Sequence, residues 1–143
     1  PPEEAERLKQ HATDKQLDTV FLVSPTTTEA RIETIAQASS GFVYYVSLKG
    51  VTGAGNLDIN QVVDRVAQIK RHTKLPVGVG FGIKDAESAG KIAAVADAIV
   101  VGSALVKLVE NNQGSQEAAT KAVSKLIAAM RKEMDKISAS SAA

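Results

Sequence analysis

The sequence predicts an α/β fold in which about four parallel strands alternate with helices. The chain has 143 residues, the size of one domain, and its residues are 44% hydrophobic but only 3% aromatic. A core built from Val, Ile, Leu and Ala suits helices layered on a sheet. Four short runs rich in β-branched residues are each followed by a helical pattern, and they stand at residues 19–24, 42–47, 77–80 and 98–101.

The chain is expected to open with a helix that leads into the first two strands. Prolines and glutamates at the start are typical of a first helical turn, so we expect a helix over residues 1–12. The continuous apolar run TVFLVS at 19–24 is typical of a parallel strand buried on both faces. Thr26 and Glu29 then fit a capping box that opens the next helix, and the strand FVYYVS follows at 42–47.

A long irregular segment separates the second strand from the next helix. Residues 48–57 contain three glycines, and a connection of this length and composition is more often a mobile functional loop than a plain connector. Asp58 can cap the helix that follows, whose apolar residues recur at i, i+3 and i+4 as far as about His72.

The last part of the chain is expected to end in two helices. Asp85 is a good N-cap for the helix after the third strand, and a short helix over residues 103–110 begins directly after the fourth strand. A long amphipathic helix then carries Met130 and Met134 as core residues, and residues 139–143 are expected to form a frayed tail.

Two glycine-bearing turns follow the third and fourth strands, and they point to a phosphate site. The run VGVGFGI at 77–83 and the run AIVVGSA at 98–104 each stop at glycine and give way to a helical pattern. Glycine lets backbone N–H groups approach a ligand, and a helix N-terminus adds a partial positive charge. One such turn alone would more often be a plain tight turn, but two on adjacent strands favour phosphate binding.

Composition argues against several other functions. The net charge is +1 with no basic run, so nucleic acid is not expected as a partner, and no stretch is long and apolar enough for a membrane span. The chain has no cysteine, and His11 and His72 lack metal-ligand spacing and are expected to be solvated. We therefore expect a soluble, cytoplasmic protein that has no metal site.

Four strand-and-helix units make either a small open sheet or half of an eight-stranded barrel. A short extra helix whose N-terminus faces the last strand's glycine turn is a recurring feature of phosphate-binding barrels. The residues then resemble one family closely. The motifs GFVYYVSLKGVTGA at 41–54, GFGI at 80–83 and GSALVK at 102–107 are similar, in order and spacing, to those of the tryptophan synthase alpha subunit.

This resemblance implies that residues 1–143 are the C-terminal half of a single (β/α)8 TIM barrel domain, holding strands five to eight. The family's enzyme is a lyase of tryptophan biosynthesis that cleaves indole-3-glycerol phosphate to indole and glyceraldehyde 3-phosphate without a cofactor. Its catalytic glutamate and aspartate lie on earlier strands, so the resemblance assigns no catalytic residue to this chain. It also implies the family's beta subunit as a partner of the full-length protein.

The resemblance also assigns roles to residues of this half. Substrate phosphate would be held by a group of backbone N–H donors and one hydroxyl, at Gly53, Gly82, Gly102 and Ser103. Tyr44 and Phe81 would line the substrate pocket, and Thr52 would support the absent aspartate when its loop closes. Leu48 stands where many relatives carry arginine, so how the loop would be held in its closed position is in question.

The residues leave other functions open. The four strand ends carry Ser24, Ser47, Gly80 and Gly102, whereas Asp18 and Asp97 precede their strands and are expected at the opposite edge. A binding or assembly module is one alternative, in which the open edges pair with a second copy or with a separate N-terminal half. A different phosphate-sugar barrel enzyme would need an acid or lysine at a strand end. A dinucleotide-binding fold would need G-x-G-x-x-G rather than G-x-G-x-G.

Overall fold

The structure is a computed structural model that describes residues 1–47, 59–80 and 82–140. The four strands are β1 (Leu22–Val23), β2 (Val43–Val46), β3 (Val77–Gly80) and β4 (Ala98–Val100). A 3-10 turn, η1 (Pro2–Glu4), precedes the helices, which are α1 (Glu6–Asp14), α2 (Glu29–Ala38), α3 (Ile59–His72), α4 (Ala86–Ala93), α5 (Ser103–Glu110) and α6 (Gln116–Ser140).

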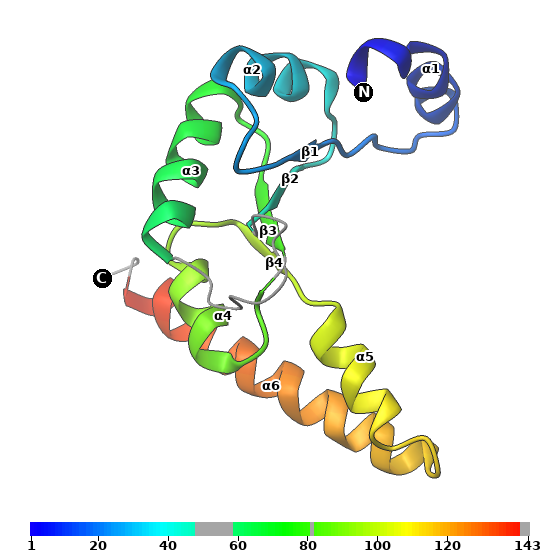
Figure 1. Cartoon of the computed structure of the whole chain (residues 1–143), viewed down its shortest axis with the longest axis vertical. Coiled ribbons are helices and arrows are strands. Elements are labelled where there is room, and N and C mark those ends of the chain that lie inside the picture. The colour runs from blue at the N-terminus through cyan, green and yellow to red at the C-terminus, as the bar shows by residue number, and fades with distance from the viewer. Residues whose placement is uncertain (48–58, 81, 141–143) are drawn as a thin grey trace.

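The strands form one parallel sheet in the order β1-β2-β3-β4, as the alternation of strand and helix predicts (Figure 1). The register pairs Tyr44 with both Leu22 and Gly78, and it pairs Gly80 with both Val46 and Val100. The carboxyl ends of β2, β3 and β4 therefore lie side by side at one edge of the sheet.

Helices α2, α3 and α4 cover one face of this sheet, and the core lies between them and the strands (Figure 1). Every other strand residue points to this face. Those of β1, β2 and β3 are at most 2% exposed, and Ile99 of β4 is partly buried against them. The core is aliphatic, as the composition predicts, with one tyrosine. Its largest fully buried side chains are Tyr45, Ile32, Ile69, Ile92, Val23, Val43, Val62, Val66, Val77 and Val79.

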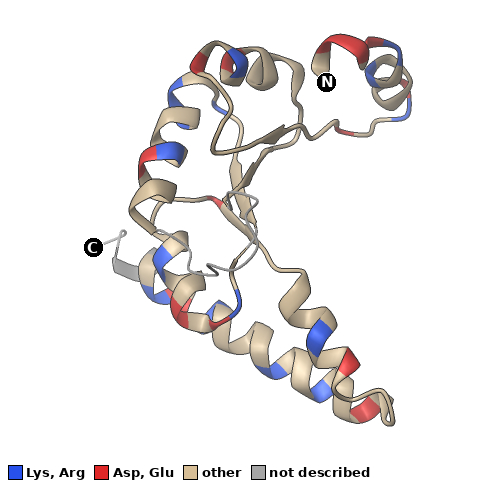
Figure 2. Ribbon diagram, in the orientation of Figure 1, with Lys and Arg blue, Asp and Glu red and all other residues tan. Residues whose placement is uncertain are grey.

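The opposite face of the sheet carries two glycines with an aromatic ring over each. A Cβ on Gly78 would lie 3.1 Å from the ring of Phe42, a tight contact. A Cβ on Gly80 would overlap the hydroxyl of Tyr44. Leu22 on this face is 59% exposed. In Figure 1 helices α1 and α5 lie on this side, at opposite ends of the sheet. Figure 2 shows basic and acidic residues interspersed over the helices.

The start of α2 differs from the expected capping box. The helix begins at Glu29 with Thr28 as N-cap, and no side chain caps it. The threonines bond to Ser24 instead: the Ser24 N–H donates to Thr27 Oγ1 at 2.9 Å, and the Ser24 and Thr26 hydroxyls lie 3.1 Å apart. Short hydroxyl side chains form hydrogen bonds with nearby backbone as readily as they cap helices. Here Thr26 and Thr27 bond within the turn after β1 and do not cap α2.

Other element bounds also differ from the sequence predictions. β1 is only two residues long, so part of the 19–24 run lies outside the ladder. The first helix is interrupted at Ala5, between η1 and α1. α6 continues to Ser140, although the sequence predicts a tail from residue 139. Residues 48–58, with the predicted loop and the Asp58 cap, lie outside the described residues.

The expected roles of the methionines and of one histidine are confirmed. Met130 is buried in the core, and Met134 packs against it. His11 is exposed on α1, as expected. His72 is not simply solvated: it is half-buried, and its Nε2 lies 3.1 Å from Oε1 of Glu29. This hydrogen bond with His72 is the main cause that holds the pKa of Glu29 below its ordinary value.

Candidate phosphate site

The turn after β3 is built around a glycine in the left-handed backbone region. Gly82 has φ +77°, a conformation that side chains with a Cβ adopt with strain. Ile83 directly after it is 5% exposed and belongs to the core, which anchors the turn. Asp85 then caps α4, because its carboxylate accepts from the Ser88 N–H at 2.8 Å. The predicted cap at Asp85 is confirmed.

The turn after β4 places an exposed helix N-terminus beside the first turn. Gly102 is the N-cap of α5, and a Cβ built on it would meet no heavy atom within 4 Å. Its carbonyl accepts from the N–H groups of Leu105 and Val106 at 2.9 and 3.2 Å, while no side chain caps the helix. The first N–H groups of a helix have no partner within it, so those that open α5 are available to an anion.

The sheet register brings these two turns together. Gly80 of β3 pairs with Val100 of β4, and Gly82 and Gly102 each follow two residues later. Both turns therefore leave the same edge of the sheet from neighbouring strands. Ser103, the first residue of α5, is exposed at this edge, and its hydroxyl belongs to the same helix N-terminus. The arrangement is chemically suited to hold an anion with backbone N–H groups and a hydroxyl.

The end of β2 is fastened to this edge by two hydrogen bonds. Ser47 donates to the Gly80 carbonyl from its hydroxyl at 2.7 Å and from its N–H at 3.0 Å. Tyr44, three residues earlier, extends its ring along the sheet so that its hydroxyl stands over Gly80. Of the residues expected in the substrate pocket, Tyr44 therefore lies one strand away from the Gly82 turn.

Several predicted site residues lie outside the described residues. These are Gly53 and Thr52 in the segment after β2, Phe81 between the two glycines of the β3 turn, and Leu48. Gly82, Gly102, Ser103 and Tyr44 are the predicted site residues that the structure places.

The acidic residues Asp97 and Asp18 lie at the other edge of the sheet, as the sequence predicts. Asp97 Oδ2 accepts from the N–H of Val77, the first residue of β3, at 2.8 Å, and Oδ1 accepts from Lys70 Nζ at 3.0 Å. Burial raises the pKa of Asp97. The hydrogen bonds from Val77 and Lys70 act in the opposite direction, and the pKa lies below its ordinary value. Asp18 lies against Gly41, just before β2. In the described part of the chain, no group of His, Cys, Asp and Glu could hold a metal ion.

Sequence reasoning missed Arg65, which fixes the turn after β1. From α3 its guanidinium donates to the carbonyls of Ser24 and Pro25, both at 3.2 Å, and to that of Thr27. Burial raises the pKa of the neighbouring Tyr45, and the charge of Arg65 acts in the opposite direction. In the sequence, Arg65 lies next to the apolar residues of α3 that face the core. An arginine at such a position ordinarily extends into solvent. No pattern in the sequence could have singled it out.

None of the described helices is long and apolar enough to span a bilayer.

Comparison with protein families identifies relatives over nearly the whole chain. The family model for the tryptophan synthase alpha chain matches residues 1–137. The tryptophan synthase alpha chain of Thioalkalivibrio sulfidiphilus is 54% identical over 135 residues, which are 94% of this chain and 51% of the relative. That of Nitrosococcus oceani is also 54% identical over 135 residues, covering 94% of this chain and 50% of the relative.

Solved structures agree with this result. The tryptophan synthase subunit alpha of Legionella pneumophila superposes with a TM-score of 0.77 at 33% identity, covering 95% of this chain and 49% of that chain. A chain of the tryptophan synthase α2β2 complex of Pyrococcus furiosus gives a TM-score of 0.78 at 33% identity, covering 92% and 52%. The chain thus spans about half the length of the relatives it matches.

Proposed function

Because this chain belongs to the tryptophan synthase alpha chain family, a family of lyases in tryptophan biosynthesis, we propose that it supplies the substrate-phosphate site of such an enzyme. The predicted fold class is confirmed: four parallel strands with their helices form half of the family's TIM-barrel-type fold. We further propose that residues 1–143 correspond to its C-terminal half and form one domain unit, acting in the cytoplasm.

One observation supports the phosphate site above all others. The Gly102 N-cap opens α5 with empty space where a Cβ would stand, next to the turn in which Gly82 has a positive φ. A dianionic phosphate placed there would accept hydrogen bonds from the backbone N–H groups of Gly82, Gly102 and Ser103, and from the Ser103 hydroxyl. The proposal keeps Gly53 as a fourth donor, with Tyr44, Phe81 and Thr52 near the rest of the substrate.

The proposed reaction is the cleavage of indole-3-glycerol phosphate. The indole ring gains a proton at C3, the bond from C3 to the glycerol phosphate chain breaks, and the hydroxyl of that chain loses its proton as the aldehyde forms. The products are indole and glyceraldehyde 3-phosphate. Both proton transfers need an acid or base beside the substrate. The described residues at the four strand ends are serines and glycines: Ser24, Ser47, Gly80 and Gly102. We therefore propose that this chain alone is inactive.

The phosphate site is tested by Gly102→Asp, with Gly114→Asp as the matched control. Both glycines have open space at the Cβ position and both stand at a turn beside α5, so each variant adds a carboxylate without a clash. Gly102→Asp should reduce glycerol phosphate binding at least about a hundredfold, since a carboxylate would meet the phosphate directly. Calorimetry measures this, and unchanged binding by folded Gly102→Asp would refute the assignment.

Catalysis is tested by measuring indole release from indole-3-glycerol phosphate. We expect none from this chain alone, and activity after mixing it with a separately made N-terminal half of a relative. Indole release by the chain alone would show that catalytic residues have been overlooked. The beta subunit is the further partner that we propose, since the Pyrococcus furiosus relative is part of an α2β2 complex. Pull-down with a relative's beta subunit tests it.

An assembly module is the second candidate function. Large apolar side chains are exposed at and just before β1, the edge strand of the sheet: Leu17 is 64% exposed and Leu22 is 59% exposed. Such a surface favours association with a second copy or with an N-terminal half-barrel. We expect sedimentation to show a concentration-dependent shift to larger species. A compact monomer at high concentration would count against this candidate.

A further inference from the structure

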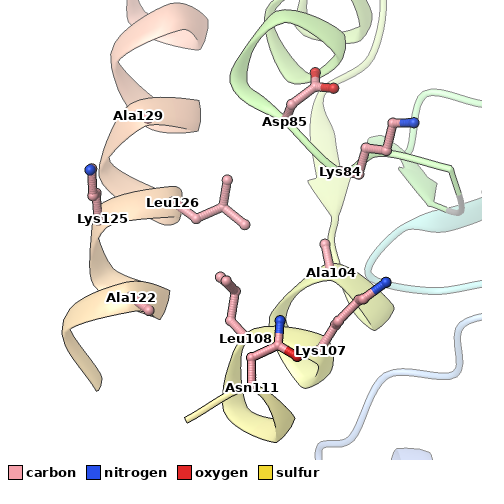
Figure 3. Close-up of a pocket in the computed structure, with 10 residues that line it drawn as sticks. All are labelled: Lys84, Asp85, Ala104, Lys107, Leu108, Asn111, Ala122, Lys125, Leu126 and Ala129. Atoms are coloured by element: carbon pink, nitrogen blue, oxygen red, sulfur yellow. The ribbon is translucent and has the colours of Figure 1, made fainter. Parts of the chain in front are cut away.

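A cavity lies between α5, α6 and the start of α4 (Figure 3). Its volume is about 670 Å³, which falls within the range of small-molecule sites. Leu108 of α5 and Leu126 of α6 point toward one another across it (Figure 3). Three alanines, Ala104, Ala122 and Ala129, leave the space between the helices open.

The rim of this cavity is basic. Lys84, Lys107 and Lys125 line it together with one acidic residue, Asp85. The Asp85 carboxylate is already engaged as the cap of α4. In Figure 3 the side chains of Lys84 and Lys107 extend away from Leu108 and Leu126, both to the side opposite α6, whereas Lys125 lies on α6.

None of these three lysines is held in an ion pair within the described residues, although the charge of Lys84 acts on the neighbouring Asp85 carboxylate. Elsewhere Lys91 pairs with Glu87 at 2.6 Å and Lys136 pairs with Glu133 at 2.7 Å. Figure 2 shows basic residues along both α5 and α6, and acidic residues near the turn that joins them. The cavity therefore combines an apolar interior with a rim that carries three lysines and one carboxylate.

We propose that this cavity binds a small amphipathic anion, with an aromatic or aliphatic body between Leu108 and Leu126 and an acidic group at Lys84 and Lys107. The body removes apolar surface of both leucines from water, and the acidic group gains two cations that are not held in ion pairs within the described residues. A neutral ligand would forgo the rim, and a cation would be repelled by it. The inference does not depend on the proposed phosphate site, because Gly82, Gly102 and Ser103 do not line this cavity.

The probe is 2-naphthalenesulfonate, titrated into the isotopically labelled full chain and followed by amide NMR shifts. We expect saturable shifts centred on Ala104, Leu108, Ala122 and Leu126. The neutral analogue 2-naphthol should bind about tenfold more weakly, because it lacks the charge that the lysines recognise. Glycerol phosphate in excess should leave the naphthalenesulfonate shifts unchanged.

Two matched variant pairs locate the site. Ala129→Phe places a ring in the cavity and should abolish binding, whereas Ala128→Phe adds the same ring at the neighbouring exposed alanine, which does not line it, and should not. Lys84→Gln/Lys107→Gln should weaken binding about tenfold. Lys121→Gln/Lys132→Gln removes two exposed lysines of α6 that do not line this cavity, and should change binding less than twofold.

The remaining outcomes overturn the proposal. Shifts centred on Leu22 and Tyr44 would place the probe on the sheet face instead. Equal binding of naphthalenesulfonate and naphthol would remove the role of the lysines. Undiminished binding by Ala129→Phe, and by Ala122→Phe as a second cavity-filling variant, would show that the probe binds elsewhere.

Discussion

The two faces of the sheet are built from alternate residues of the same strands, yet their side chains meet opposite surroundings. Toward α2, α3 and α4, the strand residues Val43, Tyr45 and Val79 are at most 2% exposed. On the other face Leu22 is 59% exposed, and Gly80 contributes no side chain at all. The face toward the helices is packed with buried aliphatic side chains. The other face has glycines where side chains would otherwise stand.

This difference separates stability from function within four short strands. On the helix side, a change of volume creates a cavity or a clash in a packed interior. On the other side, the glycines of β3 let the rings of Phe42 and Tyr44 lie close over the sheet. The β3 and β4 turns that form the candidate phosphate site leave the edge that both faces share. Substitutions on the two faces should therefore affect different measurements.

The largest expected difference is between Ile69→Ala and Leu22→Ala. Ile69 of α3 is fully buried in the core, so its truncation should lower the free energy of unfolding by about 3 kcal/mol. Leu22 keeps most of its surface in water, so the same truncation should change it by less than about 0.5 kcal/mol. Urea denaturation measures both values. Equal losses would show that the open face is covered in solution.

The second comparison is between the two glycines of β3. Gly80→Ala should destabilise the fold by about 1–2 kcal/mol, because the new Cβ would occupy the place of the Tyr44 hydroxyl and force the ring away. Gly78→Ala should be nearly neutral, because the Phe42 ring needs to give only a few tenths of an ångström.

A double-mutant cycle with Tyr44→Ala checks this cause. Removing the ring should abolish most of the penalty of Gly80→Ala, so the two changes should be coupled by about 1 kcal/mol. Additive effects would mean that Gly80 is required for another reason.

The smallest expected effect concerns the cap of α4, on the packed side. Asp85→Ala should cost about 1 kcal/mol, and Asp85→Asn should recover most of it, since an amide oxygen can still accept from Ser88. The hydrogen bonds from Ser88 are the main cause that holds the pKa of Asp85 below its ordinary value.

The lowered pKa of Asp85 also predicts a pH dependence. Because the folded-state pKa lies below the unfolded-state value near 4, the stabilisation is fully present above about pH 4 and is lost as the pH falls through the folded-state pKa. Unfolding of the wild type and of Asp85→Asn, measured between about pH 5 and pH 2, should converge at the acid end. Parallel curves would assign the acid sensitivity to other carboxylates.

Much of the fold could be predicted because it depends on local patterns. The apolar stripe of α3, the Asp85 cap and the short helix starting at Ser103 follow from residue spacing, and each is present. The prediction of a capping box at Thr26 and Glu29 was wrong. Three consecutive threonines, 26–28, could each bond to this turn, and only the folded turn decides which hydroxyl bonds to which group.

The candidate site could be predicted only in part. Glycine after a strand marks Gly82 and Gly102, and the structure places both at one edge. Arg65 could not be found, because its carbonyl partners belong to a turn about forty residues earlier in the chain. The cavity between α5 and α6 was equally hidden, since its lysines are unremarkable until two helices bring them to one rim.

The sequence by itself determined the order of strands and helices, the aliphatic character of the core and the positions of the glycine turns, because each depends on residues close together in the chain. Tertiary structure decided which face of each strand is buried, which ring lies over which glycine and which charges remain unpaired. These features depend on contacts between residues far apart in the chain, and register and packing set such contacts only once the sheet has formed.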